Sequence, residues 1–325
     1  MKQESETVLI TGAAGFIGSH LTDRLLQQGL RVIGLDNFSR GTRDNLSEAL
    51  THPSFRFFEA DLSDVAEIRR IASNFQIDTV WHMVANSDIA AGIADPNIDL
   101  RDTFLSTFNI LLVMREAKIR RMAFASTSAV YGVHPGALTE NTGPLFPISN
   151  YGAMKLASEG AISAAVESFL ERAWIFRFPN VIGPRATHGI LFDLLSKLKN
   201  NREYLEVLGD GTQQKPYLHV SELVDAMLFV RDRASHSVNC FNIGPEDEGT
   251  TVRAIAEAVV QLAAPSTPIR FTSGNKGWVG DVPRFHYSIE KIKQLGWRPK
   301  FSSSDAVKRA LPEIYADLFV KSVSQ

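Results

Sequence analysis

The sequence predicts an α/β protein with a doubly wound parallel sheet and a smaller C-terminal α/β region. Short β-branched runs alternate with longer helical patterns through the first half of the chain, and this alternation is typical of βαβ units with right-handed crossovers. The predicted strands also contain continuous apolar runs such as Val8-Leu9-Ile10. Such runs indicate strands that are covered on both faces, as in a parallel sheet between two layers of helices.

Local patterns predict the individual elements in order. Short runs of β-branched and aromatic residues predict strands at Val8–Ile10, Arg31–Leu35, Phe55–Phe58, Thr79–His82, Met122–Ala125 and Trp174–Phe178. Helical periodicity predicts helices between them at Ile17–Gln28, Val65–Asn74, Leu100–Ala117 and Tyr151–Glu171. The later segments are interrupted by glycine turns, with further helices at Ile190–Lys199, Glu222–Arg231, Val252–Leu262 and Ser304–Tyr315. We expect a first domain over residues 1–178, to which residues 217–243 return, and a second region over residues 179–325.

Composition narrows the class of protein. The 325 residues carry 34 Lys and Arg against 36 Asp and Glu, a formal net charge of −2, which offers no broad basic surface for nucleic acid or an acidic membrane. The single Cys240 excludes an internal disulfide and fits a reducing compartment. No run approaches the roughly 20 apolar residues that a membrane-crossing helix needs, and the polar N-terminus is unlike a signal peptide. We expect a cytoplasmic protein that binds neither nucleic acid nor membrane. We also expect no metal site, because His82 and His219 lack a neighbouring carboxylate–histidine cluster.

A glycine-rich turn joins the first predicted strand to the first predicted helix, over Gly12–Gly18. Free N–H groups at a helix start attract an anion, and the glycines allow a tight turn and close approach of a pyrophosphate. Asp36 directly follows the second strand, where a carboxylate can accept hydrogen bonds from ribose hydroxyls and would repel a 2′-phosphate. These features predict a dinucleotide site that favours NAD over NADP, although Arg40 and Arg43 could hold that phosphate. A purely structural turn is the alternative interpretation.

Tyr151 and Lys155 lie four residues apart, and therefore on one face of the predicted helix Tyr151–Glu171. A free phenol has a pKa of about 10, and a nearby ammonium or a nicotinamide cation favours the phenolate. Such a tyrosine could move a proton on a hydroxyl while hydride moves to or from a nicotinamide. Thr127, in the loop after the strand Met122–Ala125, could relay that proton. An exposed helix pair and a hydroxyl that caps a turn are the alternatives.

Together these residues resemble the extended short-chain dehydrogenase/reductases, and among them the NAD-dependent nucleotide-sugar epimerase/dehydratase family. The likeness covers nearly the whole chain and is closest to the UDP-galactose (UDP-glucose) 4-epimerase branch. It implies a Rossmann domain that holds NAD and a second region that binds a nucleotide-sugar substrate. The motifs that carry it are Thr11–Gly18, Asp36–Gly41, Asp61-Leu62, His82–Ala85, Ser126–Gly132, Tyr151–Lys155, Arg177–Gly183, Gly209–Val220 and Gly280-Asp281-Val282.

The resemblance assigns roles position by position. It implies Thr127, Tyr151 and Lys155 as catalytic residues, and Thr127, Asn180, Lys215 and Asp281 as substrate contacts. Lys215 stands where the family often has an arginine, and it cannot supply the same bidentate fork. Trp278 stands where a second phosphate-binding arginine is common. Cofactor contacts are implied at Gly12, Gly15, Phe16, Ile17, Gly18, Asp36, Asn37, Ser39, Arg40, Gly41, Asp61, Leu62, Val84, Tyr151 and Lys155.

Two further positions separate the reactions of the family. The 4,6-dehydratases carry an Asp-Glu pair directly after the threonine, and UDP-glucuronate decarboxylases usually keep the glutamate, but this chain has Ser128 and Ala129. The resemblance therefore implies 4-epimerisation through a transient 4-keto sugar. An epimerase of a UDP-uronic acid or a UDP-N-acetylhexosamine, an NAD-dependent nucleotide-sugar reductase, and a non-catalytic NAD(H)-binding sensor are the alternatives.

We also expect a homodimer. The helices Leu100–Ala117 and Tyr151–Glu171 carry apolar positions beyond one narrow stripe, so that one face of each could pack on the sheet and another on a partner subunit. The common homodimer of the resembling family uses these same two helices.

Overall fold

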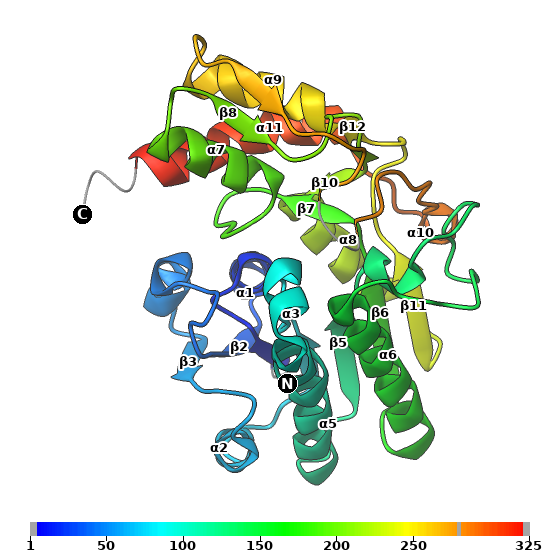
Figure 1. Cartoon of the computed structure of the whole chain (residues 1–325). Helices are drawn as coiled ribbons and strands as arrows, with labels where there is room; N and C mark the ends of the chain where they lie inside the picture. The colour runs from blue at the N-terminus through cyan, green and yellow to red at the C-terminus, as the bar shows by residue number, and fades with distance from the viewer. Residues whose placement is uncertain (1–4, 278–280, 321–325) are drawn as a thin grey trace. The chain divides into compact units, whose positions relative to one another are not determined.

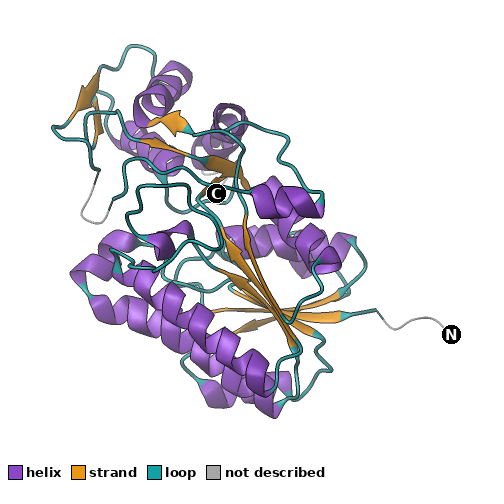
Figure 2. Cartoon of the chain, turned by 90° about the vertical axis from the view of Figure 1, so that its right-hand side faces the viewer, coloured by secondary structure: helices purple, strands orange, loops and turns teal. Residues whose placement is uncertain are grey.

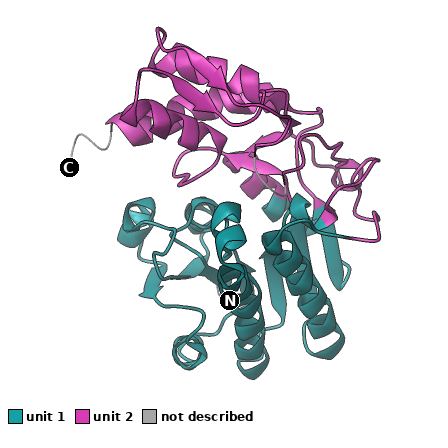
Figure 3. Cartoon of the chain, viewed as in Figure 1, with its two compact units in different colours: residues 1–130, 146–177, 227–241 teal, residues 131–145, 178–226, 242–325 magenta. Residues whose placement is uncertain are grey.

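The computed structural model of the chain describes residues 5–277 and 281–320. Its contacts divide the chain into two compact units (Figure 3). Unit 1 comprises residues 1–130, 146–177 and 227–241, and unit 2 comprises residues 131–145, 178–226 and 242–325. Unit 1 is thus assembled from three separate segments of the sequence.

Unit 1 is built on a seven-stranded parallel sheet with the strand order β11-β6-β5-β4-β1-β2-β3 (Figure 1). The order reverses between β1 and β4, which pair directly, and ligands of such sheets bind at the carboxyl ends of the strands near this point. The six strands predicted in this half are confirmed, each within two residues of its predicted ends. The strands are β1 (Thr7–Thr11), β2 (Arg31–Asp36), β3 (Phe55–Glu59), β4 (Thr79–His82), β5 (Arg121–Ala125), β6 (Arg172–Arg177) and β11 (Val238–Asn242).

Helices cover both faces of this sheet (Figure 2). Successive strand residues point to opposite faces, so Leu9 packs with Ile68, Ile110 and Ile162 in one core cluster, while its neighbours on β1 are buried on the face where α1 contacts β1 and β2. This two-sided burial confirms the doubly wound class. The helices are α1 (Phe16–Gln27), α2 (Val65–Ala72), α3 (Ile89–Ala94), α4 (Pro96–Asp99), α5 (Ser106–Glu116) and α6 (Asn150–Ser168).

The predicted helix Leu100–Ala117 differs from the structure at its start. A π-helical turn, η3 (Leu100–Leu105), precedes α5, and the short helices α3 and α4 come before it. Asp88 and Asp95 cap α3 and α4 through hydrogen bonds to Ala91 N–H and Asn97 N–H. Helices of six and four residues are too short to show a periodic pattern, and so the sequence analysis did not predict them.

Unit 2 packs helices around three short strand pairs. Leu195, Val259 and Leu311 belong to one core cluster that joins α7, α9 and α11. The four helices predicted after Phe178 are confirmed within two residues: α7 (Ile190–Asn200), α8 (Val220–Arg233), α9 (Val252–Ala263) and α11 (Ser303–Tyr315), with α10 (Glu290–Leu295) in addition. The helix α8 belongs to unit 2 as far as Ala226 and to unit 1 from Met227 on. The paired strands are β7 (Asn180–Ile182) with β10 (Tyr217–His219), β8 (Leu205–Val207) with β13 (Ile269–Phe271), and β9 (Gln214–Lys215) with β12 (Thr250–Thr251).

The remaining elements are single turns: η1 (Arg43–Leu46), η2 (Ala49–Thr51), η4 (Ser128–Tyr131) and η5 (Ala316–Val320). Across residues 5–277 and 281–320, no helix has the length and apolar character needed to span a bilayer.

Candidate active site

In the glycine-rich turn between β1 and α1, the backbone lies close to the segment after β4 and to the first turn of α1. Gly12 has a φ of +73°, a conformation that favours glycine, and a Cβ there would lie 3.1 Å from the backbone nitrogen of Val84. A Cβ on Gly18 would overlap the carbonyl oxygen of Gly12. Gly15 is the N-cap of α1 and has no side chain that could occupy the first N–H groups of the helix. The turn therefore fits a bound phosphate group.

Asp36 ends β2 beside this turn. Its Oδ2 accepts a hydrogen bond from Ala14 N–H (3.0 Å) and its Oδ1 accepts one from Phe38 N–H (2.8 Å). Burial raises the pKa of Asp36, and these backbone hydrogen bonds oppose the rise. They also fix the carboxylate next to the turn, while each oxygen keeps lone pairs that can accept from ribose hydroxyls.

The loop after Asp36 is held by its own polar contacts. Arg40 Nη2 donates to Asp88 Oδ2 (3.0 Å) and to Asn86 Oδ1 (3.3 Å), so this guanidinium already has carboxylate and amide partners. Asn37 Nδ2 donates to Asp61 Oδ2 (2.6 Å) and Asn37 Oδ1 accepts from Ser39 N–H (3.0 Å). These contacts link the predicted cofactor residues Asn37 and Asp61, and they join Arg40 to the segment after β4.

Other predicted cofactor positions also lie in unit 1. Val84 follows β4 and lies against Gly12. Leu62, after β3, is buried in the core cluster, and its carbonyl oxygen accepts from Asn109 Nδ2 (2.8 Å). A Cβ on Gly41 would contact the backbone of Ala14, so Gly41 lies against the glycine-rich turn. Their roles toward NAD remain predictions.

The three predicted catalytic residues meet where β5 ends and α6 begins. Ser149 Oγ accepts from Gly152 N–H (3.1 Å), which caps α6 and places Tyr151 in its first turn. Thr127 Oγ1 accepts from Ala129 N–H (3.1 Å) and is hydrogen-bonded to the Tyr151 phenol. One turn further along α6, Lys155 Nζ donates to the carbonyl oxygen of Ala125 (2.5 Å).

The protonation of this pair differs from the sequence-based expectation. Burial raises the pKa of Tyr151 to about 12, the hydrogen bond from Thr127 opposes the rise, and the charge of Asp99 adds to it. Burial also lowers the pKa of Lys155 to about 7, against the opposing charge of Glu159. We expected the ammonium to favour the phenolate, but here burial disfavours both charges. The phenol is therefore protonated at neutral pH.

A buried ion pair fixes α6 against the neighbouring strands. Arg177 Nε and Nη2 donate to Glu159 Oε1 (3.0 Å) and Oε2 (2.6 Å), and Ser126 Oγ donates to Glu159 Oε1. Ser126 lies between Ala125 and Thr127, the residues that contact Lys155 and Tyr151. Such bidentate pairs are geometrically specific, so this one holds loop and helix in register.

Glu159 was not among the predicted site residues. Its position four residues after Lys155, on the same helix face, is the signal that could have identified it.

His82 lies at the carboxyl end of β4 and is fully buried. Its Nδ1 is 2.7 Å from Thr11 Oγ1 and its Nε2 is 3.1 Å from Thr107 Oγ1. Thr107 Oγ1 donates to the carbonyl oxygen of Thr103 (2.8 Å), and therefore accepts from His82 Nε2–H. Burial lowers the pKa of His82 to about 3, so this histidine is a neutral packing residue with both ring nitrogens bonded.

Apart from Thr127, which lies in unit 1, the predicted substrate residues that the structure describes lie in unit 2. Lys215 Nζ forms a buried ion pair with Asp281 Oδ1, and Asp281 Oδ2 accepts from Gly277 N–H (2.9 Å). Asn180 Nδ2 donates to the carbonyl oxygen of Pro216 (3.3 Å). Because Pro216 directly follows Lys215, this hydrogen bond places Asn180 near the Lys215–Asp281 pair. Trp278, which the sequence analysis also singled out, lies outside the described residues.

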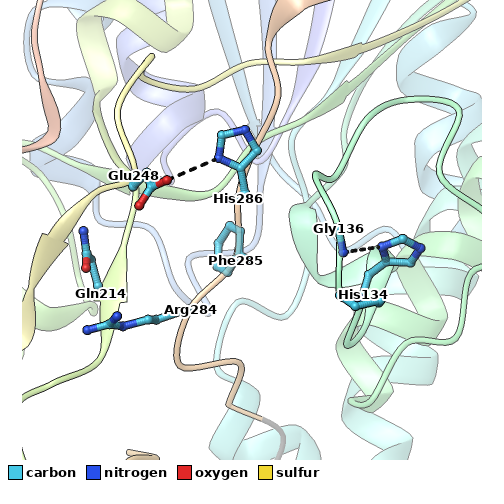
Figure 4. A pocket seen from close by; sticks show the side chains of 8 residues that line it. His134, Gly136, Gln214, Glu248, Arg284, Phe285 and His286 are labelled. Carbon is cyan, nitrogen blue, oxygen red and sulfur yellow. Dashed lines mark hydrogen bonds and ion pairs between the residues drawn. The ribbon is translucent and has the colours of Figure 1, made fainter.

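A surface pocket with a cavity volume of about 240 Å³ also lies in unit 2 (Figure 4). Its lining residues are His134, Pro135, Gly136, Gln214, Glu248, Arg284, Phe285 and His286. Of the predicted site residues within the described ranges, none lines it. Among the described residues there is also no group of three or more His, Cys, Asp and Glu side chains arranged to bind a metal ion.

Comparison with known proteins places the chain in a family. The family model described as "NAD dependent epimerase/dehydratase family" matches residues 8–244. A putative UDP-glucose 4-epimerase of Methanocaldococcus jannaschii is 29% identical and covers 94% of this chain and 97% of its own. A crystal structure of a UDP-galactose 4-epimerase matches with 32% identity and a TM-score of 0.84, over 96% of this chain and 100% of that one. The UDP-glucose 4-epimerase of Thermus thermophilus, solved with NAD, matches with 29% identity and a TM-score of 0.83, over 94% and 98%.

These full-length matches agree with the geometry of unit 1, in which a glycine-rich turn, the Asp36 carboxylate at the end of β2 and a Thr–Tyr–Lys group share one sheet. The chain belongs to the NAD-dependent epimerase/dehydratase family and uses NAD as its cofactor.

Proposed function

We propose that the protein is a 4-epimerase of nucleotide-diphosphate sugars of the UDP-glucose/UDP-galactose type. The observation that carries this proposal is the grouping of Thr127, Tyr151 and Lys155 at the carboxyl edge of the sheet that also holds the dinucleotide turn. The names of the relatives support the same reaction. Ser128 and Ala129 stand where dehydratases of this family carry an acid–base pair, which favours epimerisation over loss of water.

The residues of unit 1 fit the cofactor. The turn Gly12–Gly18 would hold the pyrophosphate, Asp36 the adenosine ribose and Lys155 the nicotinamide ribose. When bound, NAD supplies the hydride acceptor and donor for the sugar carbon. Because epimerisation has no net oxidation, NAD is regenerated in each cycle and is expected to stay with the protein.

We assign the proton transfer to Tyr151. Its phenolate oxygen would take the proton of the sugar 4-hydroxyl, and its phenol would return a proton to the 4-keto oxygen. Thr127 Oγ1 accepts from Ala129 N–H, so its only proton is available to the phenol oxygen. Lys155 favours the phenolate in its protonated form, which its pKa of about 7 makes available near neutral pH.

In unit 2 we propose that Asn180 and Lys215 contact the diphosphate of the substrate and that Asp281 contacts the nucleotide ribose. The Lys215–Asp281 pair is buried, with 8% and 3% of these residues exposed. A diphosphate that draws on the Lys215 charge would have to compete with Asp281. A single lysine also offers one point charge rather than an arginine fork, so we expect weaker diphosphate binding than an arginine would give.

The test of this function is Tyr151→Phe. Removing the phenol should lower interconversion of UDP-glucose and UDP-galactose by at least about 10²-fold, while the purified variant keeps its NAD. Tyr204→Phe, which removes a phenol in unit 2, is the control and should keep full activity. UDP-glucuronate and UDP-N-acetylglucosamine belong in the same assay to identify the sugar. An active Tyr151→Phe variant would remove Tyr151 from its proposed role.

We further propose that the enzyme is a cytoplasmic homodimer. Leu105, Phe108 and Leu112 recur at helical spacing over the end of η3 and along α5, and are 40%, 44% and 38% exposed. Such a row of large apolar side chains favours a partner subunit on this face. The sole cysteine, Cys240, fits a reducing compartment.

A further inference from the structure

Asp99, the last residue of α4, is a buried carboxylate close to the proposed proton-transfer site. Asp99 is 1% exposed, and its Oδ1 accepts a hydrogen bond from Asn86 Nδ2 (2.9 Å). Within the described part of the chain, Asp99 Oδ2 is buried and has no hydrogen-bond partner. A buried carboxylate oxygen without a partner is costly to keep and requires an explanation.

The packing of α4 brings this carboxylate to the start of α6. A Cβ on Gly92 would overlap Asp99 Oδ2, so the missing side chain of Gly92 provides the space that the carboxylate fills. The carbonyl oxygen of Gly92 accepts from Asn150 Nδ2 (3.0 Å). Asn150 is the first residue of α6 and directly precedes Tyr151, and α3, α4 and η3 all pack against α6.

The charges on the neighbouring elements are largely balanced. On the α3 side, Asp88 pairs with Arg40 at 3.0 Å, and on η3, Asp102 pairs with Arg101 at 2.6 Å. These carboxylates lie in half-exposed side chains, where water screens them. By contrast, the hydrogen-bond partner of Asp99 within residues 5–277 and 281–320 is the neutral Asn86 amide.

The charges on α6 and the strands beneath it do not offset Asp99 either. Glu159 is neutralised by Arg177 from β6, and His82 from β4 is neutral because burial lowers its pKa to about 3. Lys155 lies one turn along α6 from Tyr151, and its pKa of about 7 leaves it only partly charged at neutral pH. Burial is the main cause of the raised pKa of Tyr151, and the charge of Asp99 adds to it.

The ionisation of Asp99 itself reflects two opposing effects. Burial raises its pKa, the hydrogen bond from Asn86 lowers it, and the charges of Asp102 and Asp88 raise it further. The Asn86 amide donates to Oδ1, and this contact favours the charged form.

We propose that Asp99 is a positioning residue that acts together with burial to keep the Tyr151 phenol protonated until a cation lies beside it, so that Tyr151 becomes a base only in the presence of the oxidised nicotinamide. A fixed negative charge disfavours a neighbouring phenolate, and a nicotinamide cation opposes that effect. This inference rests on the proposed role of Tyr151. It explains why an unpartnered carboxylate is held at this point of the fold.

The test measures the phenolate directly in the NAD-loaded protein. The chain has six tyrosines, so ¹³C labelling at Cζ gives few resonances, and Tyr151→Phe identifies the one from Tyr151. In Asp99→Asn the side chain keeps its shape and can still accept from Asn86. We expect its Tyr151 midpoint to lie at least half a pH unit below that of the unsubstituted protein, which is about a threefold higher ratio of phenolate to phenol at a given pH.

Two further variants complete the experiment. Asp102→Asn removes a charge on the neighbouring η3 that water screens. It should leave the titration midpoint of Tyr151 unchanged. Asp99→Ser removes the Asp99 charge with a smaller side chain, so that it reports the same shift if Asp99→Asn does not fold. Equal phenolate fractions in the Asp99 variants and the unsubstituted protein from pH 6 to 10 would overturn the proposal. A phenolate that persists across this whole range in the unsubstituted protein loaded with NADH, which lacks the nicotinamide cation, would also do so. No turnover is measured, so an absence of epimerase activity would count against the proposed function alone.

Discussion

Burial of the Lys155 ammonium in unit 1 lowers the free energy of unfolding, because the charged amine loses its hydration. The pKa of Lys155 falls from 10.5 to about 7 on folding. Between these pH values the unfolded chain binds more protons than the folded one, so the free energy of unfolding rises as pH rises from 7 to 10.5. The cost of the buried amine is therefore largest at and below pH 7.

We expect Lys155→Met to raise the free energy of unfolding while it abolishes the proposed activity. The lost desolvation cost, about 1.4 kcal/mol per pKa unit, exceeds the loss of one hydrogen bond to Ala125. We expect a gain of about 3 kcal/mol at pH 7 that shrinks toward pH 10. Urea unfolding at the two pH values measures it. A Lys155→Met protein that is less stable at pH 7 would contradict the burial argument.

The sequence predicted this pair by its spacing but not by its protonation. The positions of Tyr151 and Lys155 on one helix face follow from the helical period. Their ionisation depends on burial and on Asp99, which lies about fifty positions earlier in the chain on a four-residue helix. Neither the burial of the pair nor its proximity to Asp99 can be recognised from a local sequence pattern. Sequence reasoning could therefore predict which residues meet, and could not predict their charge.

At the scale of elements, the Glu159–Arg177 pair joins α6 to β6 and to the loop after β5. Glu159→Gln would leave the Arg177 guanidinium buried without its counter-charge, because Arg177 is 6% exposed. Breaking a buried pair on one side costs about 3–5 kcal/mol, and we expect a loss of that size in urea unfolding. Glu167→Gln, an exposed site on the same helix, is the matched control and should change stability by less than about 0.5 kcal/mol. Equal effects of the two substitutions would show that the pair does not join these elements.

The junction of β1 and α1 gives a second prediction at this scale. Gly18→Ala would place a Cβ onto the carbonyl oxygen of Gly12, so the turn must open and its N–H groups move. We expect a loss of NAD binding of at least about tenfold, measured by calorimetry. Gly160→Ala on α6 is the control: a Cβ there meets nothing within 4 Å. Because alanine is the better helix former, it should stabilise the chain by about 0.5–1 kcal/mol. Unchanged NAD affinity in Gly18→Ala would remove the turn from the cofactor site.

Elements with a periodic apolar pattern of sufficient length were predictable, and very short helices and contacts between distant residues were not. The strands β1 to β6 and the helices α1, α2 and α6 show apolar patterns of sufficient length. The helices α3 and α4 instead depend on the caps Asp88 and Asp95, and they determine where Asp99 lies. The ion pair of Lys215 and Asp281 joins positions 66 residues apart, which a single sequence does not connect.

For the molecule as a whole, the exposed apolar row on η3 and α5 predicts its state of association. Phe108→Glu would introduce a charge into the face that we propose to bury between two subunits, and desolvating that charge opposes association. We expect a monomer by light scattering at micromolar concentration, where the unsubstituted protein is a dimer. Leu262→Glu alters an apolar residue of α9 that is 43% exposed and should leave the dimer intact. A monomeric unsubstituted protein would refute the dimer outright.

The discontinuity of unit 1 has a consequence for its synthesis on the ribosome. The outermost strand β11 pairs with β6, and Ala173 N–H donates to the carbonyl oxygen of Ser237 (2.8 Å). A nascent chain that has emerged only as far as Arg177 would leave β6 as an open edge, the kind of strand that recruits foreign chains. The sheet of unit 1 can be completed only after residues 178–226, which belong to unit 2, have left the exit tunnel. We therefore expect nascent-chain chaperones to be needed most in that interval.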